Sequence, residues 1–227
     1  GTGKSLIALQ LGISTAVGRF WLGHQVMQQG PVVCLSAEDE EDELHRRVAG
    51  ICDAEGVDLA DLDDFRILSR ADGSAMLAVP EGGMMKPTGL YGQLRDAVGE
   101  LRPRLVILDT LADLHAGNEN DRQHARQVIG LMRQIAIEVR CAVVVLAHPS
   151  LTGIASGTGS SGSTGWEGSV RSRLYFERVK DEDGAEPDVD LRTLKLMKTN
   201  YGRADAEVRV RYDAGRFVME GGSDRFE

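Results

Sequence analysis

The sequence has no apolar run long enough to cross a membrane. Its longest apolar stretches, residues 105–108 and 143–147, are far shorter than the roughly 20 residues that a membrane-spanning helix needs. Hydrophobic residues still make up 42% of the 227 positions, which excludes a mainly disordered chain and leaves a globular protein with a large core. We therefore expect no membrane partner.

Cysteine is scarce and has no metal-binding pattern. Cys34, Cys52 and Cys141 lack the close spacing of zinc ligands, and three cysteines cannot all pair with one another. We interpret them as reduced thiols, which predicts a cytoplasmic protein.

The sequence also lacks an excess of positive charge. Lys and Arg number 26 against 35 Asp and Glu, which gives a formal net charge of −9 and an isoelectric point of about 5.1. Residues 38–64 account for this excess, with 12 acidic and 2 basic side chains. The balance argues against a general electrostatic grip on nucleic acid, although a local basic groove or the pore of an oligomer would escape such a sum.

The chain has no initiator methionine and no signal-peptide pattern, and it begins on Gly1-Thr2-Gly3-Lys4-Ser5. The last three of these residues match the end of the phosphate-binding motif G-x-x-x-x-G-K-[ST]. In that motif backbone N–H groups wrap a polyphosphate, the lysine reaches the outer phosphates and the hydroxyl ligates Mg²⁺. We expect the chain to be the inside of a longer protein, with the first glycine of the motif and a preceding strand lying upstream.

A second interpretation of this start is a flexible glycine-rich segment with Ser5 as a helix cap. Residues 5–17 are nearly all apolar and compatible with a helix. This predicts a buried helix whose N-terminus faces phosphate, and it favours the phosphate-binding interpretation.

Downstream of the motif, short apolar runs alternate with amphipathic segments. The sequence predicts strands at residues 31–36, 65–68, 104–109 and 141–147, helices at residues 40–55, 88–101 and 121–139, and a loop at residues 71–87. This alternation indicates an α/β fold with a mostly parallel central sheet flanked by helices. Ligands of such sheets bind at the carboxyl ends of the strands.

The last third of the chain changes in character. Residues 149–166 carry no Asp, Glu, Lys or Arg and are rich in Gly, Ser and Thr, which predicts either a solvated linker or a ligand-contacting loop. Strands and hairpins are predicted at residues 170–179, 191–199 and 206–212. We expect a single domain over residues 1–219 that lacks its first strand, and a frayed tail at residues 220–227.

Three chemically useful side chains directly follow buried strands, so all should project to one edge of the sheet. Asp109 follows the apolar run at residues 105–108, the pattern of a carboxylate that holds Mg²⁺. Glu38 or Asp39 would accept the proton of an attacking water, and His148 would sense a γ-phosphate. The alternatives are a strand that merely ends in Asp, a dipole-favoured first helical turn and a neutral hydrogen-bonded histidine. We assign catalysis to Glu38 and the acidic residues after Asp39 to the helical turn.

Four motifs follow the phosphate-binding start in a fixed order: Glu38-Asp39, Leu108-Asp109-Thr110, Leu146-Ala147-His148 and Lys198-Thr199-Asn200-Tyr201-Gly202. Together they resemble the RepA-type hexameric replicative helicases of the RecA/DnaB superfamily, which are RecA-like P-loop ATPase domains of the AAA_25 type. The similarity extends over residues 1–217. It implies a RecA-like ATPase core in which six subunits form a ring and ATP with Mg²⁺ lies between neighbours.

The resemblance also implies roles for individual residues. ATP binding is assigned to Gly1, Thr2, Gly3, Lys4, Ser5 and Asp109, Mg²⁺ ligation to Ser5 and Asp109, and catalytic roles to Glu38 and His148.

An arginine finger from a neighbouring subunit is implied as well. DnaB-like proteins carry Lys-x-Arg-x-Gly near their last strands, but this chain keeps only the lysine, Lys198, and has Asn200 in place of the arginine. In the RepA-type pattern the finger lies in the preceding strand, where Arg173 is our first candidate and Arg171 the second, with Lys198 as an auxiliary cation. The alternative for both arginines is a solvated sheet face.

The sequence thus predicts an ATP-hydrolysing helicase domain, of plasmid, phage or mobile-element type, that moves along single-stranded DNA. Residues 149–166 would contact the phosphate backbone in the pore, and a primase or initiator module is a further candidate partner. Arg122, His124 and Arg126, beside a second candidate loop at residues 115–120, would add positive charge there, but we favour the polar face of a helix for them. The alternatives are a RecA- or KaiC-like regulatory ATPase without unwinding activity and a non-catalytic interaction domain with an incomplete phosphate loop.

Overall fold

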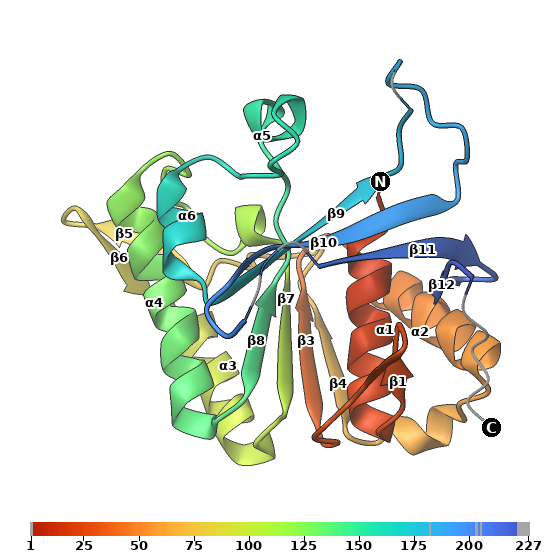
Figure 1. Ribbon diagram of the computed structural model, residues 1–227. Coiled ribbons are helices and arrows are strands. Elements are labelled where there is room, and N and C mark those ends of the chain that lie inside the picture. Colours follow the sequence, from red (N-terminus) through yellow and green to blue (C-terminus); the bar gives the residue numbers. More distant parts are fainter. Residues whose placement is uncertain (1, 182, 203, 205, 222–227) are drawn as a thin grey trace.

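The computed structural model describes residues 2–181, 183–202, 204 and 206–221. Gly1, with its predicted phosphate contact, and most of the predicted tail lie outside the described residues. A parallel sheet, flanked by helices on both faces, lies beside an antiparallel sheet formed by the C-terminal part of the chain (Figure 1). The predicted α/β fold is confirmed.

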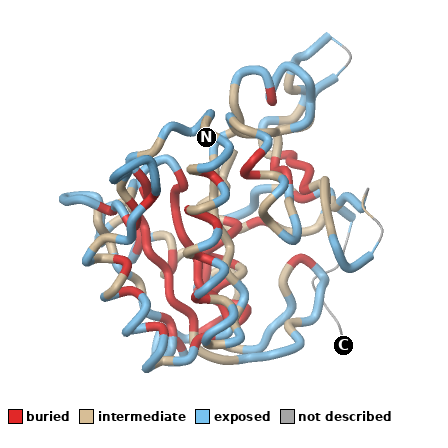
Figure 2. The backbone as a smooth tube through the Cα atoms, turned by 90° about the vertical axis from the view of Figure 1, so that its left-hand side faces the viewer, coloured by how far each residue is buried: buried red, intermediate tan, exposed pale blue. Residues whose placement is uncertain are grey.

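The parallel sheet is apolar because both of its faces are covered. Its strands lie in the order β4 (Phe65–Ser69), β3 (Val32–Ser36), β7 (Leu105–Asp109) and β8 (Ala142–Val145). Every residue of β3 and β7 is buried, as the red segments of the central strands show in Figure 2. Alternate side chains serve opposite cores: Val33 and Val106 belong to one, and Val32 and Leu105 to the other.

Helices cover the two faces of this sheet. On one face lie α1 (Lys4–Val17) and α2 (Glu41–Glu55), and on the other α3 (Gly89–Leu101) and α4 (Arg122–Val139). The side chain of Thr88 caps α3, and that of Asp121 caps α4. Short 3₁₀ turns, η1 (Leu59–Leu62) and η2 (Leu111–Asp113), follow α2 and β7. None of the helices in the described part of the chain is long and apolar enough to span a membrane.

The antiparallel sheet holds the start of α1 in place. Its strands lie in the order β12 (Arg216–Met219), β11 (Glu207–Asp213), β10 (Leu191–Thr199) and β9 (Ser172–Arg178). A separate small core joins Ile7 of α1 to Phe176 and Phe217 of the sheet. Gln10 adds two hydrogen bonds, since its amide donates to the carbonyl of Phe217 at 2.9 Å and accepts from the N–H of Phe217 at 3.0 Å.

The prediction of a loop over residues 71–87 is wrong for the second half of that range. Strands β5 (Ala78–Glu81) and β6 (Met84–Pro87) form an antiparallel hairpin around Gly82 and Gly83, both of which have positive φ. Two-residue hairpin turns need such angles, and glycine adopts them without strain. The two glycines therefore mark a tight turn. A second small hairpin, β1 (Phe20–Trp21) with β2 (His24–Gln25), is also not predicted by the sequence pattern.

Residues 149–166 are more ordered than a solvated linker. They contain α5 (Leu151–Ala155), which projects from the body in Figure 1, and the start of α6 (Thr164–Ser169). The anchor is Trp166, which is 6% exposed and donates its indole N–H to the carbonyl of Glu119 at 2.9 Å. This buried ring anchors the end of a segment whose average composition predicts disorder.

Candidate functional site

The start of α1 is shaped to hold an anion. Gly3 precedes the helix with a φ of 94°, and an added Cβ would lie 2.6 Å from Cζ of Phe217. Only glycine fits both constraints. The first N–H groups of the helix have no acceptor within it, and they lie at the positive end of the helix dipole. The hydroxyl of Thr2 is buried beside them without a hydrogen-bond partner among the described residues.

Ser5 connects this helix to the neighbouring strand. Its hydroxyl donates a hydrogen bond to Asp109, which ends β7 and is 5% exposed. Ser5 lies inside α1, and Gly3 occupies the cap position, so the interpretation of Ser5 as a helix cap is wrong.

Burial shifts the titration of both charged groups at this point. It raises the pKa of the Asp109 carboxyl, against the hydrogen bond from Ser5. It lowers the pKa of the Lys4 ammonium, against the attraction of Asp109 and Glu38. The charged groups of Lys4 and Asp109 are therefore held close together in a partly desolvated site, which lowers the stability of the fold.

The donor set fits Mg²⁺ and a polyphosphate. A hydroxyl oxygen and a carboxylate oxygen, from Ser5 and Asp109, are the hard ligands that Mg²⁺ prefers alongside phosphate and water. Lys4, directly after Gly3, is placed to contact the outer phosphates. An anion bound beside Lys4 and a divalent cation bound beside Asp109 would offset this desolvation cost by direct attraction.

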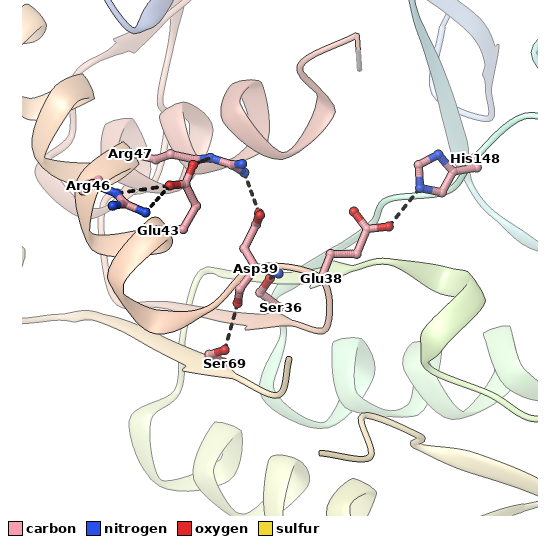
Figure 3. A network of polar contacts seen from close by, with 8 residues as sticks. All are labelled: Ser36, Glu38, Asp39, Glu43, Arg46, Arg47, Ser69 and His148. Atoms are coloured by element: carbon pink, nitrogen blue, oxygen red, sulfur yellow. Dashed lines mark hydrogen bonds and ion pairs between the residues drawn. The ribbon is translucent and has the colours of Figure 1, made fainter. Parts of the chain in front are cut away.

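Glu38 and His148 come from two different strand ends and meet at the same edge. Oε1 of Glu38 lies 3.0 Å from Nε2 of His148 (Figure 3). Their side chains are 43% and 57% exposed, so water reaches both. Glu38 follows β3, whose last residue, Ser36, pairs in register with Asp109 of β7. The structure thus brings Glu38, Asp109 and His148 to one edge.

Asp39 points away from His148 in Figure 3. Its carboxylate pairs with Arg47 of α2, and its carbonyl accepts a hydrogen bond from the Ser69 hydroxyl at 2.8 Å. Glu43 also pairs with Arg47, at 2.8 Å. The residues after Glu38 therefore organise the start of α2, which leaves Glu38 as the carboxylate directed across the site.

Two of the three predicted cations near the antiparallel sheet, Arg173 and Lys198, are engaged within the chain. Nη2 of Arg173 pairs with Oε1 of Glu167 at 2.8 Å, and its Nη1 donates to the carbonyl of Thr158 at 2.7 Å. Nζ of Lys198 donates to the carbonyl of Glu167 at 2.8 Å. Arg171 precedes β9 and is exposed, and its side chain makes no hydrogen bond or ion pair within the described part of the chain.

Sequence reasoning missed Glu167. It is the only charged side chain between Pro149 and Val170, and this isolation was the available signal. The cation that pairs with this carboxylate comes from a separate element, and the sequence does not show that Arg173 lies opposite.

A helix start that presents a lysine and a serine to a buried strand-end aspartate is the arrangement with which P-loop proteins bind nucleoside triphosphates, and the chain has the architecture of that class. The amino-acid sequence identifies the family within that class. Residues 1–153 match the AAA domain family, AAA_25, and the chain belongs to this family of P-loop ATPase domains.

Solved structures of similar fold support the RecA-like architecture. The RadB recombinase matches with a TM-score of 0.64 and 14% sequence identity, over 96% of this chain and 86% of that one. A second solved structure, that of an ATPase domain, matches with a TM-score of 0.65 and 15% identity, over 97% of this chain and 81% of that one. At such identities the likeness shows the fold.

Proposed function

We propose that this chain hydrolyses ATP as the motor domain of a replicative DNA helicase of plasmid, phage or mobile-element type. The observation that carries the proposal is the contact of Glu38 with His148 at the sheet edge where Ser5 meets Asp109. Membership of the AAA domain family supports the ATPase part. The ordered motifs that resemble RepA-type helicases support movement along single-stranded DNA.

The position of each site residue suggests its role in ATP binding or hydrolysis. Lys4 contacts the outer phosphates, and Ser5 with Asp109 holds Mg²⁺, which when bound neutralises charge on the transferring phosphoryl group. Glu38, exposed to water, orients the attacking water and accepts its proton. His148 shares a hydrogen bond with Glu38 and directly precedes Pro149. A change at the phosphate is therefore transmitted through Glu38 and His148 to the segment that begins at Pro149.

A ring of subunits would complete this site. Among the described residues, Lys4 is the cation that interacts with Asp109, so the charge that develops on the departing phosphate calls for a second one. A neighbouring subunit would supply it from Arg171, whose side chain makes no hydrogen bond or ion pair among the described residues, or from Arg173 after release from Glu167. We propose a hexamer with ATP between neighbours, and a primase or initiator module as a further partner.

The segment at residues 149–166 is the proposed contact to single-stranded DNA. It offers backbone N–H groups and hydroxyls, which bind phosphate oxygens without reading bases. Arg122 and Arg126 are exposed on α4, so they are available to add charge to a DNA path. Their position equally fits the polar face of that helix.

Replacing the proposed catalytic carboxylate tests the ATPase. We expect Glu38→Gln to lower the rate of ATP hydrolysis by about 10²- to 10⁴-fold, because the amide cannot accept a proton, while ATP affinity stays within about twofold. Glu40→Gln is the matched control, since Glu40 is exposed at the N-cap of α2 and its side chain makes no capping hydrogen bond.

The outcomes separate the candidate functions. Normal hydrolysis by Glu38→Gln would contradict the assignment of Glu38. Hydrolysis without strand separation would favour a regulatory ATPase, and absence of nucleotide binding would favour a non-catalytic interaction domain.

A further inference from the structure

The charge-free segment contains a small closed loop. Ser150 donates both its N–H and its hydroxyl to the carbonyl of Ser160, at 2.9 and 3.0 Å, and the N–H of Gly159 donates to the carbonyl of Gly153 at 2.9 Å. An added Cβ at Gly153 would lie 2.1 Å from the Ser160 oxygen, and one at Gly159 would lie 2.2 Å from the Tyr175 ring. Residues 150–160, which we name the 150–160 loop, therefore form a body with a defined shape that rests on the antiparallel sheet.

Arg173, in β9 of the antiparallel sheet, holds this loop. One nitrogen of its guanidinium donates to the carbonyl of Thr158 in the loop, at 2.7 Å, and another pairs with Glu167 of α6 at 2.8 Å. The Arg173 side chain is only 16% exposed, so its bonds are poorly screened by solvent. A planar guanidinium can serve both acceptors at once, whereas an ammonium at the same place cannot span them equally well.

Lys198 strengthens the same junction. It pairs in register with Arg173 across β9 and β10, and its ammonium donates to the carbonyls of Glu167 and Val170 at 2.8 and 2.9 Å. The cation thus satisfies carbonyl groups at the C-terminal end of α6. Glu167 is held through its side chain by Arg173 and through its backbone by Lys198.

The other side of α6 is docked on the body of the domain. The ring of Trp166 lies 5.1 Å from that of His115, and Glu119 accepts hydrogen bonds from the indole of Trp166 and from the N–H of Ser163. These contacts hold α6, and with it Glu167, in place, and Arg173 bridges Glu167 to the loop.

We propose that Arg173 and Glu167 are a positioning pair that sets the pose of the 150–160 loop, and with it the strength of its contact to single-stranded DNA. The DNA part rests on the proposed function. Arg173 is then occupied within its own chain, and Arg171 is the arginine that remains for a neighbouring subunit.

A double-mutant cycle tests the pair. Arg173→Ala and Glu167→Ala should each speed hydrogen exchange at the amides of Ser150 and Gly159, and should each weaken binding of a fluorescent oligothymidylate about tenfold. The double variant should be no worse than Arg173→Ala, because Arg173→Ala already removes both the pairing with Glu167 and the bond to Thr158. The ATP affinity of Glu167→Ala should not change, which a general loss of structure would not allow. Arg209→Ala, an exposed arginine of the same sheet, is the control.

The results separate the two proposals. Unchanged exchange in either single variant, or effects of the two changes that multiply in the double variant, would overturn the positioning pair. If the unaltered protein binds no oligothymidylate, the DNA function fails, and the exchange data still decide whether the pair holds the loop. Should the alanine variants fold poorly, Arg173→Lys and Glu167→Gln keep most of the volume and should show the same faster exchange.

Discussion

The carboxylate of Asp109 destabilises the unliganded fold. Burial raises its pKa, so the folded chain binds a proton there more tightly than the unfolded chain does. Its contribution to stability is therefore fully present below the ordinary carboxyl pKa of about 4 and is lost as the pH rises through the raised value. At neutral pH the protein keeps this cost, which Mg²⁺ ligation would explain.

At the scale of a single residue, the burial of Asp109 predicts that a neutral replacement gains stability and loses activity. Asp109→Asn should raise the free energy of unfolding at pH 7 by about 1 kcal/mol and abolish ATP hydrolysis, because a neutral amide avoids the desolvation cost but ligates Mg²⁺ poorly. Urea unfolding without nucleotide measures the first effect. Asp113→Asn, at an exposed position of η2, should change stability by less than about 0.5 kcal/mol. A destabilised Asp109→Asn protein would show that the carboxylate supports the fold.

Some individual residues were predictable from the sequence and others were not. Glu38 and Asp109 follow apolar runs, and the rule that parallel strands end at one edge is enough to bring them together. The opposite directions of Glu38 and Asp39 depend on Arg47, eight positions further on, and no local pattern reveals that pairing. The occupation of Arg173 by Glu167 is likewise a contact between separate elements.

At the scale of elements, the 150–160 loop depends on close backbone packing. Gly153→Ala should open the loop, because its Cβ would overlap the Ser160 carbonyl, and overpacking of this kind costs about 1–3 kcal/mol. We expect faster hydrogen exchange at Gly159 with little change in the melting temperature of the domain. Gly168→Ala in α6 has nothing within 4 Å of the added atom and should leave this exchange unchanged. Equal exchange in the two variants would argue against a closed loop.

The elements that the sequence predicts well are those with strong periodicity. Five buried residues in each of β3 and β7, and the apolar stripe of α4, follow directly from hydrophobic spacing. The hairpin of β5 and β6 was missed because Gly82 and Gly83 signal both loops and tight turns. The order in residues 149–166 was missed because it depends on contacts between separate elements, such as the hydrogen bonds of Trp166 to Glu119 and of Arg173 to Thr158.

At the scale of the whole molecule, the excess of negative charge lies in one region. The acidic residues 38–64 form the start and surroundings of α2, whereas α4 and α6 lie on the opposite side of the parallel sheet in Figure 1. Outside residues 38–64 the chain is close to neutral. The overall charge of −9 is thus compatible with a DNA path along α5 and the segment around it.

The proposed function couples ATP hydrolysis to single-stranded DNA. The most direct measurement is the steady-state rate of ATP hydrolysis by the protein that contains this chain, with and without oligothymidylate, compared with its Lys4→Ala and Glu38→Gln variants. We predict a rate that rises when oligothymidylate is added, and almost no hydrolysis by either variant under both conditions. A rate that is the same with and without DNA, or variants that hydrolyse ATP normally, would contradict the proposed function.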